Sequence, residues 1–294
     1  MLDNNISPVC IALGYFDGVH LGHQKVIERA VQLSKKLECN CVVFSFDGNL
    51  KRLLGNNEGK FLYSTAERES LIESVGASSL FEKANKTFLS KGKRAFLNYL
   101  NKKFLVKGYV CGYDYRFGKG GKGDTNYLTE YARAHGQECI IVPPVSLDGE
   151  TVSTTEIKNL LSTGNVEKAK LFLGKPYSIT GMVKSGRKVG RDLGFPTVNI
   201  KPEKDRAQLK FGVYSGFARF GGKKYSAIIN YGTRPTFCKG EAVVEAHLVD
   251  FSANIYGEKI TVFFEKFVRE EKKFLNRAEL IKQIKKDLET LKEI

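Results

Sequence analysis

The stretch Gly14-Tyr-Phe-Asp17-Gly18-Val-His20-Leu-Gly22-His23 decides the fold of the first half of this chain. It follows an apolar run at 9–13 that is typical of a buried strand, and it leads into residues 24–37, whose apolar positions keep helical spacing. The two histidines are therefore predicted to lie at a strand-to-helix turn. Backbone N–H groups and the positive end of a helix dipole meet at such a turn and bind phosphate. Imidazoles placed there can hydrogen-bond a phosphate whose charge grows during its transfer. The plainer alternative is a surface turn in which neighbouring groups merely satisfy both histidines.

Strand-like and helix-like segments alternate through the rest of this half. The predicted strands are 41–46, 109–112 and 139–142, and the predicted helices are 65–72, 91–103 and 126–135. Thr65 is the expected N-cap of its helix, with Arg68 in the place where a capping box would have glutamate. This alternation predicts a parallel, doubly wound, Rossmann-like sheet that binds ligands at the carboxyl ends of its strands.

The pattern changes after residue 175, where short strands separated by glycines predict a small antiparallel β-barrel. These strands are expected at 177–183, 212–220, 224–230, 242–249 and 258–267. A terminal helix should begin at Asn276, with Glu279 as its capping acid and an apolar stripe along one face. The predicted fold class is thus α/β plus β. The predicted domains are 1–158 and 177–294, joined by a helical linker at 159–176.

Length and composition set the broad class of the protein. A chain of 294 residues suits two domains. We expect no signal peptide, because residues 1–8 lack a basic start, and no segment approaches the roughly 18 apolar residues that span a bilayer. Six scattered cysteines without zinc-finger spacing are typical of free thiols in a reducing compartment, so we expect a cytoplasmic protein without membrane partners.

The net charge of +15 is unevenly distributed along the chain. Residues 156–294 carry 27 Lys and Arg against 16 Asp and Glu, whereas residues 1–155 carry 20 against 16. The basic residues are spread over many elements and form no stripe with interleaved aromatics, so nucleic acid is not the expected partner. A basic field of this kind also suits small polyphosphate ligands.

Two further segments of the first half can bind phosphate. The glycine-rich loop 112–124, which includes Asp114 and Arg116, lets the backbone approach a ligand closely. The run Ser153-Thr154-Thr155 brings three hydroxyls to the start of a helix, and Lys158 follows with a positive charge. Taken alone, the first is an ordinary surface loop and the second an ordinary helix cap.

The second half contains its own glycine-rich motif, Gly186-Arg-Lys-Val-Gly190-Arg191-Asp-Leu-Gly194-Phe195-Pro196-Thr197-Val-Asn199. Its glycines can fold around phosphates, while Arg191 and nearby Lys184 supply charge. Thr197 and Asn199 face the same side of an extended segment, and their neutral oxygens suit Mg²⁺ held jointly with a nucleotide. The alternative is a hairpin in which these side chains only satisfy backbone groups.

Glu245 lies in the predicted strand Val244-Glu245-Ala246-His247-Leu248. The apolar residues at 244, 246 and 248 occupy one face, so Glu245 and His247 point together to the other face. A carboxylate in this position is either a catalytic base or a solvent-facing residue of an edge strand. His247 is expected to be structural or to support a neighbour.

These motifs, in this order and spacing, resemble the bifunctional prokaryotic riboflavin kinase/FAD synthetase family over essentially the whole chain. The resemblance implies ATP and Mg²⁺ as cofactors and flavins as substrates and products. In the first domain His20 and His23 would stabilise the phosphates during adenylyl transfer from ATP to FMN. In the second, Glu245 would take the proton from the 5′-hydroxyl of riboflavin as it attacks ATP. The resemblance further implies three sets of binding residues. For nucleotide and phosphate they are Gly14, Phe16, Asp17, Gly22, Asp114, Arg116, Ser153, Thr154, Thr155, Lys158, Lys184, Gly190, Arg191 and Gly194. For flavin they are Phe195, Pro196, Asn230 and Arg269, and for metal Thr197 and Asn199.

The chain departs from the family pattern at two places. Lys158 stands where the family usually has arginine. A guanidinium can bind a phosphate through two parallel hydrogen bonds, whereas the ammonium of lysine offers a single compact charge. Phe46-Asp47-Gly48-Asn49-Leu50 stands where the family reads Phe-Asp/Glu-Pro-His-Pro, so we expect a more flexible loop that weakens adenylyl transfer. Two alternatives to a bifunctional enzyme follow. One is a riboflavin kinase with a silent first domain, and the other is a flavin- or RNA-binding regulator.

Overall fold

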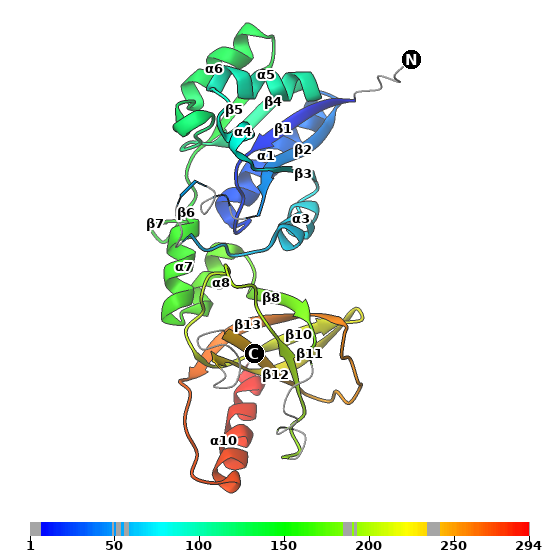
Figure 1. The fold of residues 1–294 in the computed structure, drawn as a ribbon, viewed down its shortest axis with the longest axis vertical. Coiled ribbons are helices and arrows are strands. Elements are labelled where there is room, and N and C mark those ends of the chain that lie inside the picture. Colours follow the sequence, from blue (N-terminus) through cyan, green and yellow to red (C-terminus); the bar gives the residue numbers. More distant parts are fainter. Residues whose placement is uncertain are drawn as a thin grey trace. The chain divides into compact units, whose positions relative to one another are not determined.

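The chain divides into two compact units, Met1–Thr154 and Thr155–Ile294. The structure is a computed structural model that describes residues 7–48, 50, 54–55, 59–184, 190, 193–233 and 242–293. Among these residues, no helix is both long and apolar enough to cross a membrane. Each unit is built around its own sheet (Figure 1).

The first unit contains a five-stranded sheet in which all neighbouring strands are parallel, in the order β3-β2-β1-β4-β5. The strands are β1 (Pro8–Leu13), β2 (Asn40–Asp47), β3 (Ser78–Lys83), β4 (Leu105–Gly112) and β5 (Glu138–Val142). The chain moves outward from β1 to β3 and then returns to the other side of β1. The strand order therefore reverses between β1 and β4, which is where sheets of this class bind ligands.

Helices cover both faces of this sheet, as a doubly wound fold requires. One apolar core contains α1 (Leu21–Lys36) and α3 (Thr65–Glu73), and the other contains α4 (Lys86–Leu89), α5 (Lys93–Lys103) and α6 (Thr125–Ala134). Alternate residues of β1 enter opposite cores: Cys10 and Ala12 face α1, while Ile11 and Leu13 face α5. A short hairpin, β6 (Ser146–Leu147) and β7 (Glu150–Thr151), completes the unit.

The predicted start of α3 was wrong by one residue. Ser64 is the N-cap and forms a capping box: its hydroxyl accepts a hydrogen bond from Glu67 N–H (3.4 Å), and the Glu67 carboxylate accepts one from Ser64 N–H (2.9 Å). This shift places Thr65 at the first helical position and turns Arg68 toward the protein interior, where only 1% of it is exposed. Strand β3 was also missed, because this edge strand is half-buried and reads as a polar segment in the sequence.

The second unit is a six-stranded antiparallel sheet that curls on itself, preceded by α7 (Thr154–Thr163) and α8 (Val166–Leu173). In the order β8-β13-β10-β11-β12-β9, its strands are β8 (Tyr177–Met182), β13 (Lys259–Arg269), β10 (Gly212–Phe220), β11 (Lys223–Thr233), β12 (Ala242–Leu248) and β9 (Thr197–Ile200). The two edges meet where Lys184 N–H donates to the carbonyl of Asn199 (2.8 Å). Gly181 permits this approach, since a Cβ there would lie 2.2 Å from Ile200. The predicted small β-barrel is confirmed.

The terminal helix α10 (Arg277–Glu289) begins as predicted, with Asn276 accepting a hydrogen bond from Glu279 N–H. A short 3₁₀ turn, η2 (Thr290–Glu293), follows it. One buried ion pair joins α10 to the end of β13: Arg269 Nη2 lies 2.7 Å from Asp287 Oδ2. No local pattern indicates this pair, because Asp287 simply interrupts an apolar stripe.

Candidate functional sites

The turn after β1 has a constrained backbone. Phe16 and Val19 are buried and have positive φ angles of 51° and 41°, a region that bulky side chains rarely adopt. Gly14 fits beneath Phe16, because a Cβ there would lie 2.8 Å from the Phe16 ring. Asp17 is also buried, and its Oδ1 accepts a hydrogen bond from Leu62 N–H (2.7 Å). Such strain persists only where the surroundings hold it, and it is concentrated at functional sites.

The two histidines stack on one another at the start of α1. His20 is the N-cap residue, and its Nδ1 accepts a hydrogen bond from the backbone N–H of His23 (3.3 Å). Their ring centroids lie 3.7 Å apart at an interplanar angle of 18°. Gly22 fits against this stack, since a Cβ there would lie 3.2 Å from the His20 ring. The predicted placement of both histidines at a strand-to-helix turn is thus found in the fold.

Both imidazoles are held neutral at physiological pH. Burial lowers the pKa of His20 to about 4. The pKa of His23 falls well below its usual value, first through burial and then through the nearby charges of His20 and Arg68. Because His20 Nδ1 accepts a bond, its neutral ring carries the proton on Nε2. His23 Nδ1 is buried without a hydrogen-bond partner in the described part of the chain, so this site contains a polar atom that a ligand can satisfy.

The other segments predicted for this site approach the same edge of the sheet. The carbonyl of Val152, directly before Ser153 and Thr154, lies 3.8 Å from where a Cβ on Gly22 would be. Strand β4 pairs with β1 in parallel, so the loop after β4 begins at the same edge of the sheet as the turn after β1. Asp114 and Arg116 in this loop are exposed. Arg116 lies 3.7 Å from Asp124. Thr155 and Lys158 fall in the second unit, so their part in this site stays a prediction.

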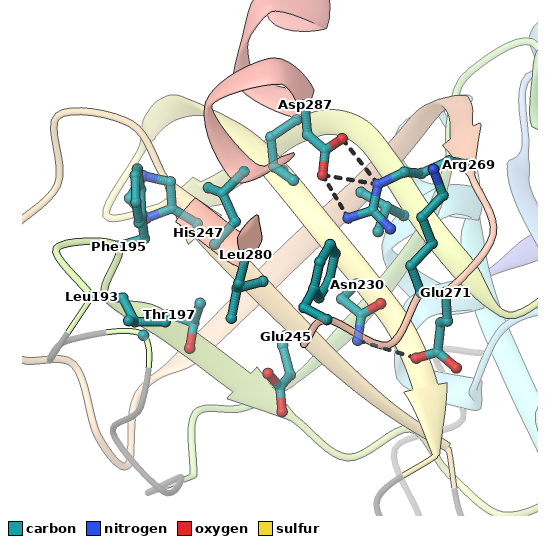
Figure 2. Close-up of a pocket in the computed structure, with 16 residues that line it drawn as sticks. Leu193, Phe195, Thr197, Asn230, Glu245, His247, Arg269, Glu271, Leu280 and Asp287 are labelled. Atoms are coloured by element: carbon teal, nitrogen blue, oxygen red, sulfur yellow. Dashed lines mark hydrogen bonds and ion pairs between the residues drawn. The ribbon is translucent and has the colours of Figure 1, made fainter. Parts of the chain in front are cut away.

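The second unit contains a pocket of about 280 Å³ between the curled sheet, α10 and the segment that joins them (Figure 2). Glu245 lines it from β12. Its register partners are Asn230 on β11 and Asn199 on β9, so a carboxylate lies between two amides across three strands. The predicted alternation of β12 is confirmed: Val244 and Ala246 are fully buried on the opposite face. Glu245 and His247 therefore share the pocket face.

The motif before β9 forms the wall of this pocket. Phe195 N–H donates to the carbonyl of Gly190 (2.7 Å). A Cβ on Gly190 would lie 2.4 Å from the carbonyl oxygen of Phe195, so a larger residue would break this turn. His247 supports the wall, with its ring edge against Phe195 at 5.4 Å and its Nδ1 2.9 Å from the carbonyl of Pro196. Gly194 is exposed beside them, with φ of +82°.

The metal-binding residues expected from the sequence lie beside Glu245. Thr197 lines the pocket, and Asn199, two residues further along β9, is buried and directly opposite Glu245. A hydroxyl, an amide oxygen and a carboxylate are hard oxygen donors, so this set fits Mg²⁺ bound together with phosphates. Of the two cations predicted here, Lys184 is exposed and Arg191 lies outside the described residues.

Arg269 lines the pocket, but its guanidinium is already engaged. Nε and Nη2 donate to the carboxylate of Asp287 at 2.7–3.1 Å, and Nη1 donates to the carbonyl of Glu270 (3.0 Å). Its predicted contact with flavin stays a prediction. Glu271, which accepts from the amide of Asn230 (3.4 Å), also lines the pocket and was missed. Its position depends on the chain folding back after β13, which no local sequence pattern indicates.

The two units therefore carry separate sites. One is the turn between β1 and α1, a kind of turn that typically binds phosphate. It lies where a doubly wound sheet reverses its strand order. The other is a pocket in a small barrel that is lined by the carboxylate of Glu245. Together they define a two-site enzyme of nucleotide and phosphate transfer.

Comparison with known proteins identifies the family. Residues 3–156 match the family model for FAD synthetase, and residues 173–294 match the model for riboflavin kinase. The bifunctional riboflavin kinase/FMN adenylyltransferase of Bacillus subtilis (strain 168) is 35% identical over 283 residues, which cover 94% of this chain and 89% of the relative. The protein of the same description from Escherichia coli (strain K12) is 29% identical, covering 96% and 91%. The crystal structure of a Streptococcus pneumoniae protein described as a macrolide-efflux protein matches with a TM-score of 0.88 and 32% identity, covering 98% of this chain and 95% of that one.

The chain belongs to the bifunctional riboflavin kinase/FMN adenylyltransferase family. This membership confirms the predicted family, the predicted enzyme class and the predicted pairing of the two activities in one chain.

Proposed function

We propose that the second unit phosphorylates riboflavin with Glu245 as the general base. Its carboxylate takes the proton of the 5′-hydroxyl while that oxygen attacks the γ-phosphate of ATP, and ADP leaves. Asn199 and Asn230 lie opposite Glu245 on the neighbouring strands, and their amides keep its surroundings polar. Mg²⁺, held by Thr197 and Asn199 together with the phosphates, would neutralise charge on the nucleotide. The position of Glu245 between two amides inside a cavity is the observation that carries this assignment.

For the first unit, the proposal is that His20 and His23 act as neutral hydrogen-bond donors in adenylyl transfer. A phosphate oxygen of FMN attacks the α-phosphate of ATP, and pyrophosphate leaves. The reaction requires no proton to be removed from the nucleophile, because the phosphate of FMN is already ionised. Neutral imidazoles suit this role, since an N–H aimed at a phosphate stabilises charge as it develops. The backbone N–H groups at the start of α1 would add to this effect.

Replacing Glu245 by glutamine tests the first assignment. Glu245→Gln keeps the size of the side chain and one acceptor oxygen but removes its charge and its basicity. We expect riboflavin phosphorylation to fall by about 10²–10⁴-fold, whereas FAD formation from added FMN stays unchanged. The measurement is chromatography of flavins after incubation with ATP and Mg²⁺.

The matched control is Glu258→Gln, an exposed glutamate in the same unit. It loses the same charge outside the pocket and should retain both activities. Unchanged riboflavin phosphorylation in Glu245→Gln would rule out Glu245 as the base.

A further inference from the structure

Hydrogen bonds from side chains hold the loop after β2 where the family has prolines. The Tyr15 hydroxyl donates to the carbonyl of Gly48 (2.7 Å) and accepts from Leu50 N–H (3.3 Å). The Thr65 hydroxyl donates to Asp47 (2.6 Å) and accepts from Gly48 N–H (3.2 Å). The described residues of this loop are therefore held by side-chain hydrogen bonds, and the expected flexibility stays a prediction. Asn49 lies outside them.

Arg68 connects these bonds to the ends of β1 and β2. Its Nη1 donates to the carbonyl of Tyr15 (2.9 Å), and its Nη2 donates to the carbonyl of Phe46 (2.8 Å) and to the Thr65 hydroxyl (3.2 Å). The guanidinium also lies 4.9 Å from the ring centroids of Tyr15 and Phe81. An arginine this deeply buried is stable only with such partners.

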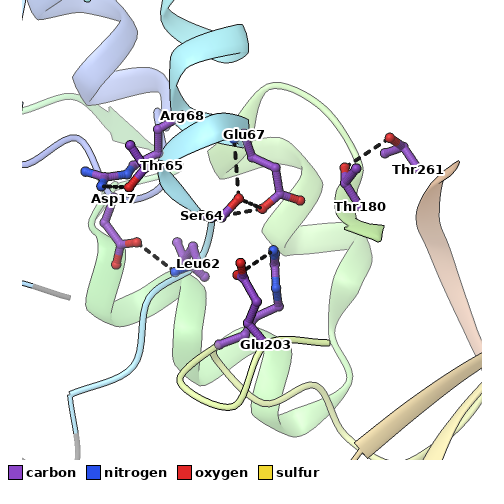
Figure 3. A network of polar contacts seen from close by, with 10 residues as sticks. Asp17, Leu62, Ser64, Thr65, Glu67, Arg68, Thr180, Glu203 and Thr261 are labelled. Atoms are coloured by element: carbon purple, nitrogen blue, oxygen red, sulfur yellow. Dashed lines mark hydrogen bonds and ion pairs between the residues drawn. The ribbon is translucent and has the colours of Figure 1, made fainter. Parts of the chain in front are cut away.

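The same helix start is anchored to the histidine turn. Leu62, two residues before the N-cap of α3, donates its backbone N–H to Asp17 (2.7 Å). Figure 3 shows Asp17 bonded to Leu62 and the side chains of Thr65 and Arg68 close by at the start of α3. The start of α3 thus contacts both the histidine turn and the loop after β2.

We propose that Tyr15, Thr65 and Arg68 are positioning residues for adenylyl transfer, which hold the loop after β2 in a fixed place beside the histidine turn. This inference rests on the proposed function of that turn. The family pattern has two prolines in this loop, which restrict its conformation. In this chain the hydroxyls of Tyr15 and Thr65 and the buried guanidinium of Arg68 hold the loop instead. Ordering the loop before the substrate arrives lowers the entropy cost of binding FMN.

The decisive comparison is between two substitutions of Thr65. Thr65→Val keeps the shape but loses the hydroxyl that three groups share, whereas Thr65→Ser retains it. We expect Thr65→Val to raise KM for FMN roughly tenfold, the effect of losing one or two net hydrogen bonds, with a smaller change in kcat. Thr65→Ser should stay within about twofold of the unaltered chain.

Thr129→Val is the matched control, because this exposed hydroxyl bonds away from the loop after β2, to the carbonyl of Thr125 (2.9 Å) and to Cys139 Sγ (3.6 Å). It should leave KM unchanged, and riboflavin phosphorylation should be normal in all variants. Tyr15→Phe should act in the same direction as Thr65→Val. The two combined should raise KM by less than the product of their separate effects, since both hold one loop.

Direct binding separates failure of this inference from failure of the proposed function. The affinity for FMN, followed by its fluorescence, needs no turnover. If the chain forms no FAD, the proposed adenylyl transfer fails, but the affinities of the Thr65 variants still decide the inference. A Thr65→Val protein that melts at a lower temperature yet binds FMN with unaltered affinity, and shows an unaltered KM where FAD is formed, would overturn it.

Discussion

His20 caps α1 and, in the proposed function, also donates a hydrogen bond from its ring during adenylyl transfer. Its Nδ1 satisfies the backbone N–H of His23, and burial lowers its pKa to about 4. An unfolded histidine takes up its proton near pH 6.5. Between pH 6.5 and 4 the unfolded chain therefore binds more protons at this residue than the folded chain does. The stability that neutral His20 contributes is complete above pH 6.5 and is lost as the pH falls toward 4.

His20→Asn separates the two roles, since asparagine is among the best N-caps but does not titrate. Between pH 7 and 4 the unaltered chain should lose about 3 kcal/mol more unfolding free energy than this variant. Urea unfolding at several pH values measures the difference. At pH 7 the variant should fold but form FAD about 10²-fold more slowly. An identical pH dependence in both proteins would contradict the pKa assigned to His20.

At the scale of the element, the loop after β2 is built for glycine and not for proline. Gly48 has φ of +70°, whereas proline is fixed near −65°. The N–H groups of Gly48 and Leu50 both donate hydrogen bonds that proline would abolish. Restoring the prolines of the family would therefore disrupt the loop.

Gly48→Pro should slow FAD formation and destabilise the first unit by about 2–3 kcal/mol. Gly48→Ala retains the N–H and should cost only about 1 kcal/mol, through its positive φ. Thermal unfolding and FAD formation of the two variants give the comparison. Faster FAD formation by Gly48→Pro would mean that the present loop limits the reaction.

The elements that the sequence predicted correctly are those whose local pattern agrees with their burial. Strand β1 and helix α1 have strong periodicity, and β12 alternates cleanly around Glu245. Strand β9 was predicted only as an extended segment and not as a strand of the sheet, because it has four residues and follows a Gly-Phe-Pro turn. The start of α3 was misjudged because Ser64 and Thr65 are both good caps. Only Ser64 has a glutamate three residues later, Glu67, as a capping box requires. Which of the two residues is the N-cap also decides whether Arg68 faces the protein interior.

At the scale of the whole molecule, the groups assigned to the two reactions lie in different units. His20 and His23 belong to the first unit, and Glu245 belongs to the second. The second half also carries most of the net positive charge, which supports the proposed binding of ATP by this unit. A substitution in either site should therefore remove one activity and leave the other intact.

Two such variants mixed in one tube should restore the complete reaction. Glu245→Gln should form FAD from FMN but no FMN, and His23→Ala should form FMN but little FAD. Together with riboflavin, ATP and Mg²⁺, the mixture should accumulate FMN first and FAD after a lag, because FMN made on one molecule must diffuse to another. Chromatography of flavins over time follows both. If each variant retains its single activity but the mixture forms no FAD, FMN is not released between the two reactions. Each chain would then have to use the FMN that it makes.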